Sequence, residues 1–418
     1  MRALLEQLNL RTKMMLIAAL ALAMAAVPTA LVLRQAVADW RVANAELAGL
    51  PPAKGLLQLM RSTQQHRGLA NGVLSGNAAG AAAREQAAQA LQAQWAPLEA
   101  AMSDLGDAAL GRRLAEHRRE LSVLLDAVQQ RQLPAAESFA RHTRLIEAQM
   151  GLVDDVAIAS GLVLHPRADG YFLQDAVLRQ LPPVAEALAQ LRGSGMGLLT
   201  RREAGPADRA RLAALVTRAR SQGAAVDKGL RLAMGAAPAG ALPGTLEAAS
   251  RALVEGLSYA ESRLIQPAEL DEPPAQWWSR MTQLIDAQYQ LGDRALEALM
   301  AGLQAHADAM QRDLVMAGVG LLLLAAACVA LVLAVGRQIT AAMQQALAMA
   351  EAVAAGDLGH RVQVRGRDEC ARMLTALDAM ARRLAGTVAG VRDNAVQVAT
   401  ASAQIAQGNL DLSGRTEQ

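Results

Sequence analysis

Arg67 is the residue whose type and position most clearly point to chemistry. Along the segment 53–75, the residues that recur at alternating steps of four and three are Leu56, Met60, Thr63, Arg67, Ala70 and Leu74. That spacing is typical of the buried face of a helix. Because an unpaired charge is very unfavourable away from water, the sequence predicts that a negatively charged group meets the guanidinium of Arg67.

Two kinds of anion fit this position. One is a small anionic ligand held bidentately by the guanidinium, with His66 at the edge of the stripe. The other is a carboxylate on a neighbouring helix, such as Asp154 or Asp155, in an interhelical ion pair; the long side chain could also extend to the surface. The sequence leaves these alternatives open.

The composition predicts helices as the elements that position Arg67. Of 418 residues, 53% are hydrophobic but only 2% aromatic and 19% charged, which favours helix over strand. A net charge of +2 argues against a nucleic-acid-binding protein. The two cysteines, Cys328 and Cys370, cannot build a disulfide framework or a metal cluster. The sequence lacks a phosphate loop, a zinc motif and a nucleophile elbow, so we expect neither an enzyme nor a cofactor.

Two apolar segments, at residues 14–33 and 314–336, predict membrane-spanning helices. Each has about twenty uncharged residues, the length that crosses a bilayer. A cleaved signal peptide is the alternative for the first, since Ala23-Met24-Ala25 resembles a cleavage site, but the apolar run continues to Leu33 and favours a retained span. The segments that precede and separate these spans are an N-terminus at 1–13 and a large insert at 34–313.

The insert is long enough for a domain of its own, and we expect two stacked helical bundles in it. Proline and glycine predict helix breaks at Pro51-Pro52, Gly76-Asn77, Pro134, His165-Pro166, Pro182-Pro183, Gly205-Pro206, 236–243 and Pro273-Pro274. The first and last helices of the insert are expected to continue the membrane spans. Trp277 and Trp278 begin the last helix, where they either fill a bundle core or line a pocket.

Two short helices joined by an extended connector are predicted after the second span. Their apolar seams are Ile339, Met343, Ala346, Ala350 and Val353, then Met373, Leu377, Met380 and Leu384. Glycines and alternating valines at 356–367 predict the connector, and an acidic pair suits the start of the second helix. This order resembles the HAMP signal-relay domain over residues 337–389, with the relay residues Gly356, Asp357, Leu358, Asp368 and Glu369. An ordinary helical hairpin after a membrane anchor is the alternative.

The HAMP resemblance implies a parallel four-helix coiled coil built from two protomers, and therefore a homodimer. It also implies that residues 34–313 are periplasmic, because that relay domain works in the cytoplasm. One departure is Ala342, which stands where the family usually has a proline. We expect it to stiffen the coupling from the membrane helix.

Residues 390–418 continue the last helix, and its heptad positions are Leu384, Val391, Val398, Ile405 and Leu412. The stretch from Asn409 to Gln418 resembles the opening of the cytoplasmic helix of methyl-accepting chemotaxis proteins. That resemblance implies control of a histidine kinase through an adaptor protein, both bound beyond residue 418, and makes Gln418 a methylation site. Relay domains also precede histidine kinases and nucleotide cyclases, and a truncated receptor partner is a third alternative. Heptads without a phosphoacceptor histidine favour the chemoreceptor.

The segment 64–70, Gln-Gln-His-Arg-Gly-Leu-Ala, resembles the start of the helical nitrate- and nitrite-sensing domain. In that family arginines from several helices surround the anion, which implies Arg192 as a second ligand contact beside Arg67. His66 stands where the family has an acidic residue. Together these resemblances predict an all-α, multi-pass receptor of the bacterial inner membrane that senses a small, anionic ligand and signals through the relay domain.

Overall fold

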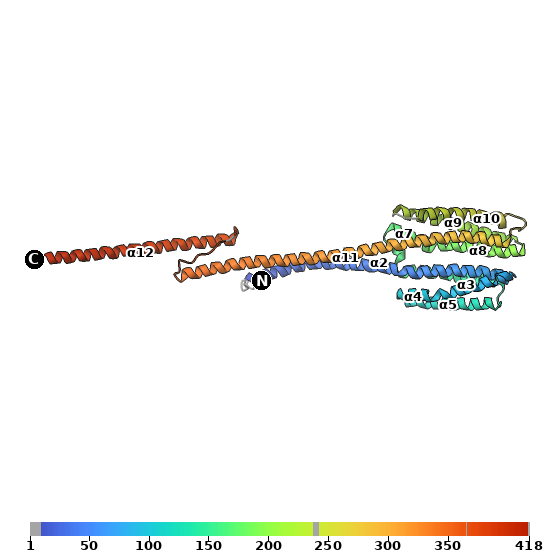
Figure 1. Ribbon diagram of the computed structural model, residues 1–418, viewed down its shortest axis with the longest axis horizontal. Coiled ribbons are helices and arrows are strands. Elements are labelled where there is room, and N and C mark those ends of the chain that lie inside the picture. The colour runs from blue at the N-terminus through green and yellow to red at the C-terminus, as the bar shows by residue number, and fades with distance from the viewer. Residues whose placement is uncertain (1–9, 237–241, 365, 417–418) are drawn as a thin grey trace. The chain divides into compact units, whose positions relative to one another are not determined.

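The computed structural model describes residues 10–236, 242–364 and 366–416, and over these residues it contains helices and turns but no strand. The long and medium helices are α2 (Leu10–Leu74), α3 (Ala81–Ala93), α4 (Trp95–Asp104), α5 (Ala108–Gln129), α6 (Ala135–Ala159), α7 (Ala168–Gln174), α8 (Leu181–Arg201), α9 (Pro206–Ala236), α10 (Leu242–Ala260), α11 (Pro274–Ala354) and α12 (Glu369–Thr416) (Figure 1). Short 3-10 segments η1 (Ala78–Gly80) and η2 (Leu162–Leu164) and π-helical segments η3 (Asp175–Gln180) and η4 (Glu261–Ile265) lie between them.

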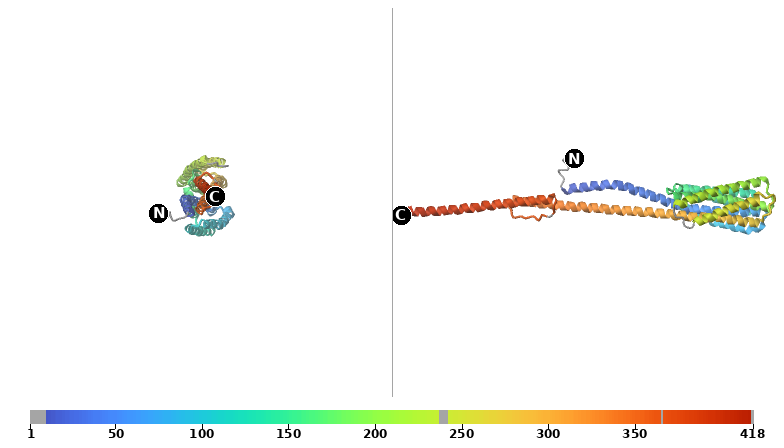
Figure 2. Two further views of the ribbon diagram at one scale, coloured as in Figure 1. Left: turned by 90° about the vertical axis from the view of Figure 1, so that its left-hand side faces the viewer. Right: turned by 90° about the horizontal axis from the view of Figure 1, so that it is seen from above.

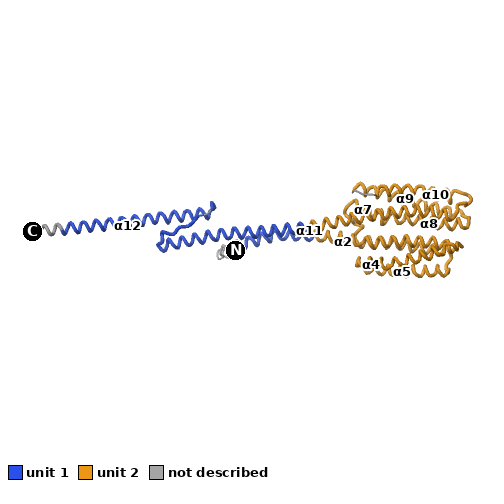
Figure 3. Tube along the Cα trace, in the orientation of Figure 1, with its two compact units in different colours: residues 1–34, 315–418 blue, residues 35–314 orange. Residues whose placement is uncertain are grey.

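The chain divides into two compact units (Figure 3). Residues 35–314 form the bundle unit, and residues 1–34 with 315–418 form the relay unit. Within the bundle unit, α3 to α6 gather around the outer part of α2, while α8, α9 and α10 gather around the first part of α11 (Figures 1 and 2). The two groups of helices lie side by side, and α2, α6, α8 and α11 meet between them.

The bundle unit has a leucine-rich core that follows from the amphipathic pattern of its helices. On α5, for example, Leu110, Leu114, Leu121 and Leu124 fall on the buried face. The Asp107 carboxylate begins this helix by accepting hydrogen bonds from the N–H groups of Ala109 and Leu110, at 2.8 and 3.1 Å. Trp277 is fully buried and stacks on Tyr259, so it fills the core.

The predicted break at Pro51-Pro52 is wrong, because α2 continues through both prolines to Leu74. A proline inside a helix removes one backbone hydrogen bond and costs about 3 kcal/mol. Here Leu50 and Ala53, on either side of the pair, are both buried in the core, and their packing offsets that cost. Pro182 and Pro183 likewise do not break a helix, since they lie in the first turn of α8, where proline is tolerated.

The relay unit contains the apolar stretches of α2 and α11. Within the part of the chain that the structure describes, two helices are long and apolar enough to cross a membrane, and their most apolar windows are not buried within the chain. Apolar side chains such as Leu20, Val27, Leu322 and Leu331 are more than half exposed, as expected of a surface that faces lipid.

The relay segment after α11 has the predicted helix, connector and helix. Gly356 follows the end of α11 with a φ of +84°, a conformation that favours glycine. The Asp357 carboxylate accepts a hydrogen bond from the N–H of Gly359 at 3.0 Å, and Leu358 is half-buried. The Asp368 carboxylate caps α12 by accepting the N–H of Ala371 at 2.8 Å, and Glu369 is the first residue of that helix. These polar contacts explain why the connector begins and ends where it does.

The predicted seams are only partly covered within one chain. Ala346 is the predicted seam residue that is buried within the described chain. The other buried residues of the relay segment, Met349, Ala371, Leu374, Asp378 and Ala381, lie outside the predicted seams. Met343, Met380 and Leu384, which the heptads assign to the seam, each expose about 40% of their surface, and Val391 and Val398 on α12 expose more. An apolar stripe on the relay helices is therefore open to a partner.

Candidate functional site: a buried arginine cluster

Arg67 is completely buried, as the helical stripe predicted, and its partner in the structure is Glu186 on α8. Nη1 and Nη2 of Arg67 donate to Oε1 and Oε2 of Glu186, at 2.5 and 3.1 Å. Nη1 also donates to Oγ1 of Thr143 on α6 at 2.9 Å, and the guanidinium lies 4.7 Å from the centroid of the Phe139 ring. Such a bidentate pair fixes both charges in orientation.

The carboxylates named from the sequence as ion-pair candidates lie elsewhere. Asp154 pairs with Arg179 at 3.5 Å, and Asp155 pairs with Arg113. Both pairs are partly exposed. Arg67 thus forms an interhelical ion pair, one of the two alternatives from the sequence, but its partner is Glu186 and neither Asp154 nor Asp155.

Glu186 is held by two amides in addition to Arg67. Nε2 of Gln64 donates to its Oε2 at 2.9 Å, and Nε2 of Gln190 donates to its Oε1 at 2.7 Å. The Tyr289 hydroxyl donates to Oε1 of Gln64 at 2.5 Å, and burial raises the pKa of that phenol above its ordinary value. Four N–H groups therefore donate to this one buried carboxylate.

Arg192 lies on the same helix as Glu186 and is 4% exposed. Its Nη1 donates to Oγ1 of Thr282 at 3.0 Å, and its guanidinium stacks over the Trp278 ring at 4.3 Å. Within the described parts of the chain it has no carboxylate at ion-pair distance, and its Nε has no hydrogen-bond partner. Burial, followed by the charge of Arg67, lowers the pKa of Arg192 to about 10, so it stays protonated at neutral pH.

Glycines bring the two arginines toward one another by letting α2 and α8 approach closely. A Cβ on Gly193 would lie 3.8 Å from the Cα of Gly68 and 2.8 Å from the Phe139 ring. A Cβ on Gly68 would lie 2.6 Å from the Trp278 indole. Each arginine directly precedes one of these glycines in the sequence, so the tightest part of the crossing is also where the cations lie.

His66 points into a different network. Its Nδ1 donates to Nε2 of His142 at 2.9 Å, since Nδ1 of His142 donates to the Ser138 carbonyl at 2.7 Å. Burial is the main cause that lowers the pKa of His66 to about 3 and that of His142 to about 4. Both imidazoles are therefore neutral at ordinary pH. No hydrogen bond joins His66 to Arg67 among the described residues.

The structure thus places Arg67 and Arg192 at the same crossing of α2 and α8. His66, also on α2, contacts His142 of α6 instead, and the relay residues lie in the other unit. Gln418 lies outside the described residues. Sequence reasoning missed Glu186, Tyr289 and Thr143. Glu186 had a signal, because it is the one acidic residue in the apolar run 181–191.

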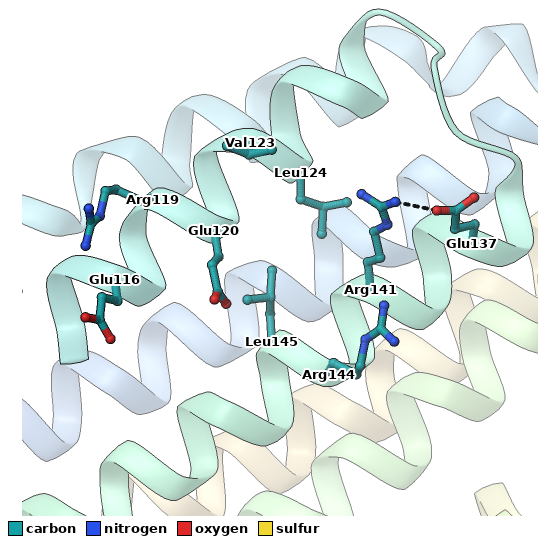
Figure 4. Close-up of a pocket in the computed structure, with 9 residues that line it drawn as sticks. All are labelled: Glu116, Arg119, Glu120, Val123, Leu124, Glu137, Arg141, Arg144 and Leu145. Atoms are coloured by element: carbon teal, nitrogen blue, oxygen red, sulfur yellow. Dashed lines mark hydrogen bonds and ion pairs between the residues drawn. The ribbon is translucent and has the colours of Figure 1, made fainter.

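A second hollow lies on the surface between α5 and α6, with a volume of about 700 Å³ (Figure 4). Its charged side chains are Glu116, Arg119, Glu120, Glu137, Arg141 and Arg144. Arg141 pairs with Glu137 at 2.5 Å. The charges balance and the hollow is open to water, which makes it a weaker candidate for an anion than the buried cluster.

A family model described as nitrate and nitrite sensing matches residues 58–300, which is more than half of the chain and includes both buried arginines. The chain belongs to the nitrate and nitrite sensing family. A second model, the HAMP domain, matches residues 334–386, so this part of the sequence prediction is confirmed. The chain therefore combines a sensing domain and a relay domain, as a signal-transducing receptor does. Two apolar helices accompany these domains in the described residues.

Relatives match locally. Methyl-accepting chemotaxis protein IV of Escherichia coli is 40% identical over 68 residues, 16% of this chain and 13% of that protein. The methyl-accepting chemotaxis aspartate transducer of Klebsiella aerogenes is 40% identical over 62 residues, 15% of this chain and 12% of that protein. The chain therefore spans a small part of these relatives. The NasR transcription antiterminator superposes with a TM-score of 0.53 at 19% identity, over 84% of this chain and 95% of that one, which shows a shared fold.

Proposed function

We propose that this protein is an inner-membrane chemoreceptor that binds nitrate or nitrite at the junction of Arg67 and Arg192. The proposal rests chiefly on Arg192, a buried and protonated guanidinium without a carboxylate partner among the described residues. A buried cation without an anion is unfavourable. A small anion that enters the junction would neutralise the charge of Arg192 and accept a hydrogen bond from its unpaired Nε–H. The family's description supports the choice of ligand.

The remaining parts of the proposal follow from the two apolar helices and the open seam. Residues 14–33 and 314–336 would span the membrane twice, with residues 34–313 in the periplasm. The exposed apolar stripe through Met343, Met380 and Leu384 supports a homodimeric coiled coil. Ligand binding would favour one of two arrangements of the dimer. That bias would reach an adaptor and a histidine kinase through the relay residues, with methylation at Gln418.

The test is anion binding by the whole chain in lipid nanodiscs. Nitrate, nitrite, chloride and acetate are titrated at constant ionic strength, while tryptophan emission follows thermal unfolding. We expect nitrate or nitrite to raise the unfolding midpoint. Arg192→Met should abolish that shift, because it removes the unpaired cation but keeps the side-chain volume. Arg220→Met is the matched control, since Arg220 forms an exposed ion pair with Glu261 and should leave the shift unchanged.

Two results would contradict the proposal. One is a folded wild-type protein whose midpoint no anion changes. The other is a folded Arg192→Met variant that keeps the full nitrate shift, since the cluster would then not be the site.

A further inference from the structure

The junction of Arg67 and Arg192 contains more positive than negative charge. Arg67 and Arg192 are cations, and Glu186 is a buried anion bound to Arg67 alone. The neighbouring groups add no net charge: Arg61 and Asp286 neutralise each other in a half-exposed pair at 2.9 Å. His66 and His142 are neutral, because burial lowers their pKa values to about 3 and 4, and Tyr289 is an uncharged phenol. One positive charge is left uncompensated.

We infer that Glu186 sets the charge of the ligand: by neutralising Arg67 it leaves room for one negative charge, so that the junction accepts a monovalent oxyanion and rejects a divalent one. This inference rests on the proposed function and assigns the selectivity to a residue of the chain. A monovalent anion makes the junction neutral. Sulfate would leave a net negative charge buried among protein groups, which is strongly unfavourable.

Glu186 is suited to be a permanent part of the site. Gln64 and Gln190 hold both of its oxygens in addition to the two bonds from Arg67. Releasing the carboxylate would break four hydrogen bonds at once, so we expect it to stay in place when an anion binds. The negative charge of Glu186 then remains in the site and repels every anion that binds there.

Donors for a ligand remain although Glu186 occupies the outer nitrogens of Arg67. Nε of Arg67 and Nε of Arg192 are both buried, and neither has a hydrogen-bond partner within the described residues. Unmet buried donors are unfavourable and are rare in native proteins. A planar oxyanion offers the acceptors that two such N–H groups lack.

Glu186→Gln tests the inference, because the amide keeps the size of the carboxylate and removes its charge. The whole chain in nanodiscs is titrated calorimetrically with potassium nitrate and with potassium sulfate at constant ionic strength. We expect the wild type to bind nitrate and not sulfate. Glu186→Gln should bind sulfate and should bind nitrate at least about tenfold more tightly, since one nearby repulsive charge is gone. Glu297→Gln, which removes an exposed acid on α11 that pairs with Arg294, should keep the wild-type preference.

The outcomes separate this inference from the proposed function. A folded Glu186→Gln variant that prefers nitrate to sulfate as the wild type does overturns the inference alone, and so does a folded variant that binds neither, because Glu186 would then only position Arg67. A wild type that binds neither salt overturns the proposed function as well.

If Glu186→Gln does not fold without ligand, its refolding is compared in sulfate and in chloride. Refolding in sulfate, beyond the general salt effect measured with Glu297→Gln, supports the inference. Failure in both salts overturns it.

Discussion

Acidification from pH 7 to pH 5 should weaken the bundle unit, and the contribution of one buried histidine, His117, can be isolated by substitution. His117 on α5 is buried, and its Nε2 accepts a hydrogen bond from Nε2 of Gln149 at 3.0 Å. Its Nδ1 is buried without a hydrogen-bond partner among the described residues. Burial lowers the pKa of His117 from 6.5 to about 4, so the folded protein keeps this imidazole neutral at pH 5.

The magnitude follows from proton linkage. Below pH 6.5 the unfolded chain binds a proton at this position, while the folded chain binds it only near pH 4. Stability is therefore lost as the pH falls through this window, and the loss ends below pH 4. Between pH 7 and pH 5 the linkage amounts to about 2 kcal/mol for one histidine. His117→Gln cannot take up the proton, so the variant should lose about 2 kcal/mol less than the wild type over the same change.

Urea unfolding of both proteins at pH 7 and pH 5 measures this difference. All four tryptophans lie between residues 35 and 314, so their emission reports on the bundle unit. The Trp95 ring is 6.2 Å from that of His117, close enough to reveal a local change. Every other titrating group is present in both proteins and cancels in the comparison. Equal losses for the two proteins would refute the reasoning, because they would mean that His117 is not buried in its neutral form.

Two further predictions concern packing and assembly. Gly195→Ala should destabilise the bundle unit by about 1–3 kcal/mol in urea unfolding, because its Cβ would lie 2.5 Å from the Trp277 indole. Gly111→Ala, also inside a helix but with no atom within 4 Å of the new Cβ, should be neutral or stabilise by up to about 1 kcal/mol; equal effects would contradict the packing. In a background without the natural cysteines, Val391→Cys should form a disulfide between two copies, seen as a dimer on non-reducing gels. Asp393→Cys, off the seam, should not, and equal cross-linking at both positions would contradict the seam.

Local features of the sequence determined what could be predicted of the fold. The apolar runs, the glycine after the end of α11 and the acidic residues at the start of α12 act over one or two helical turns, so their effects follow from the residues themselves. Pro51-Pro52 shows the limit. The local preference predicts a break, but burial of Leu50 and Ala53 in the core keeps the helix continuous, and that packing depends on distant helices.

The two arginines of the candidate site, Arg67 and Arg192, were predicted from the sequence, but the carboxylate that pairs with Arg67 was not. The helical period alone places Arg67 on a buried face, and the charge rule alone requires a partner. Which partner depends on how α8 crosses α2, and that crossing is set by the contact between Gly68 and Gly193. His66, one residue from Arg67, turns toward α6 and His142 instead, because neighbours in a helix point about 100° apart.

α11 is a single helix from Pro274 to Ala354, and it includes both Trp278, which stacks on Arg192, and Met343 on the exposed stripe. Each residue of a helix turns the chain by a fixed angle, so the number of residues between two side chains matters as well as their types. Inserting a single residue between them would turn all that follows by about 100°, whereas seven residues would nearly restore the setting. A sensor exchanged between receptors along this helix must therefore be joined in phase, and the length of the junction becomes a variable as consequential as its composition.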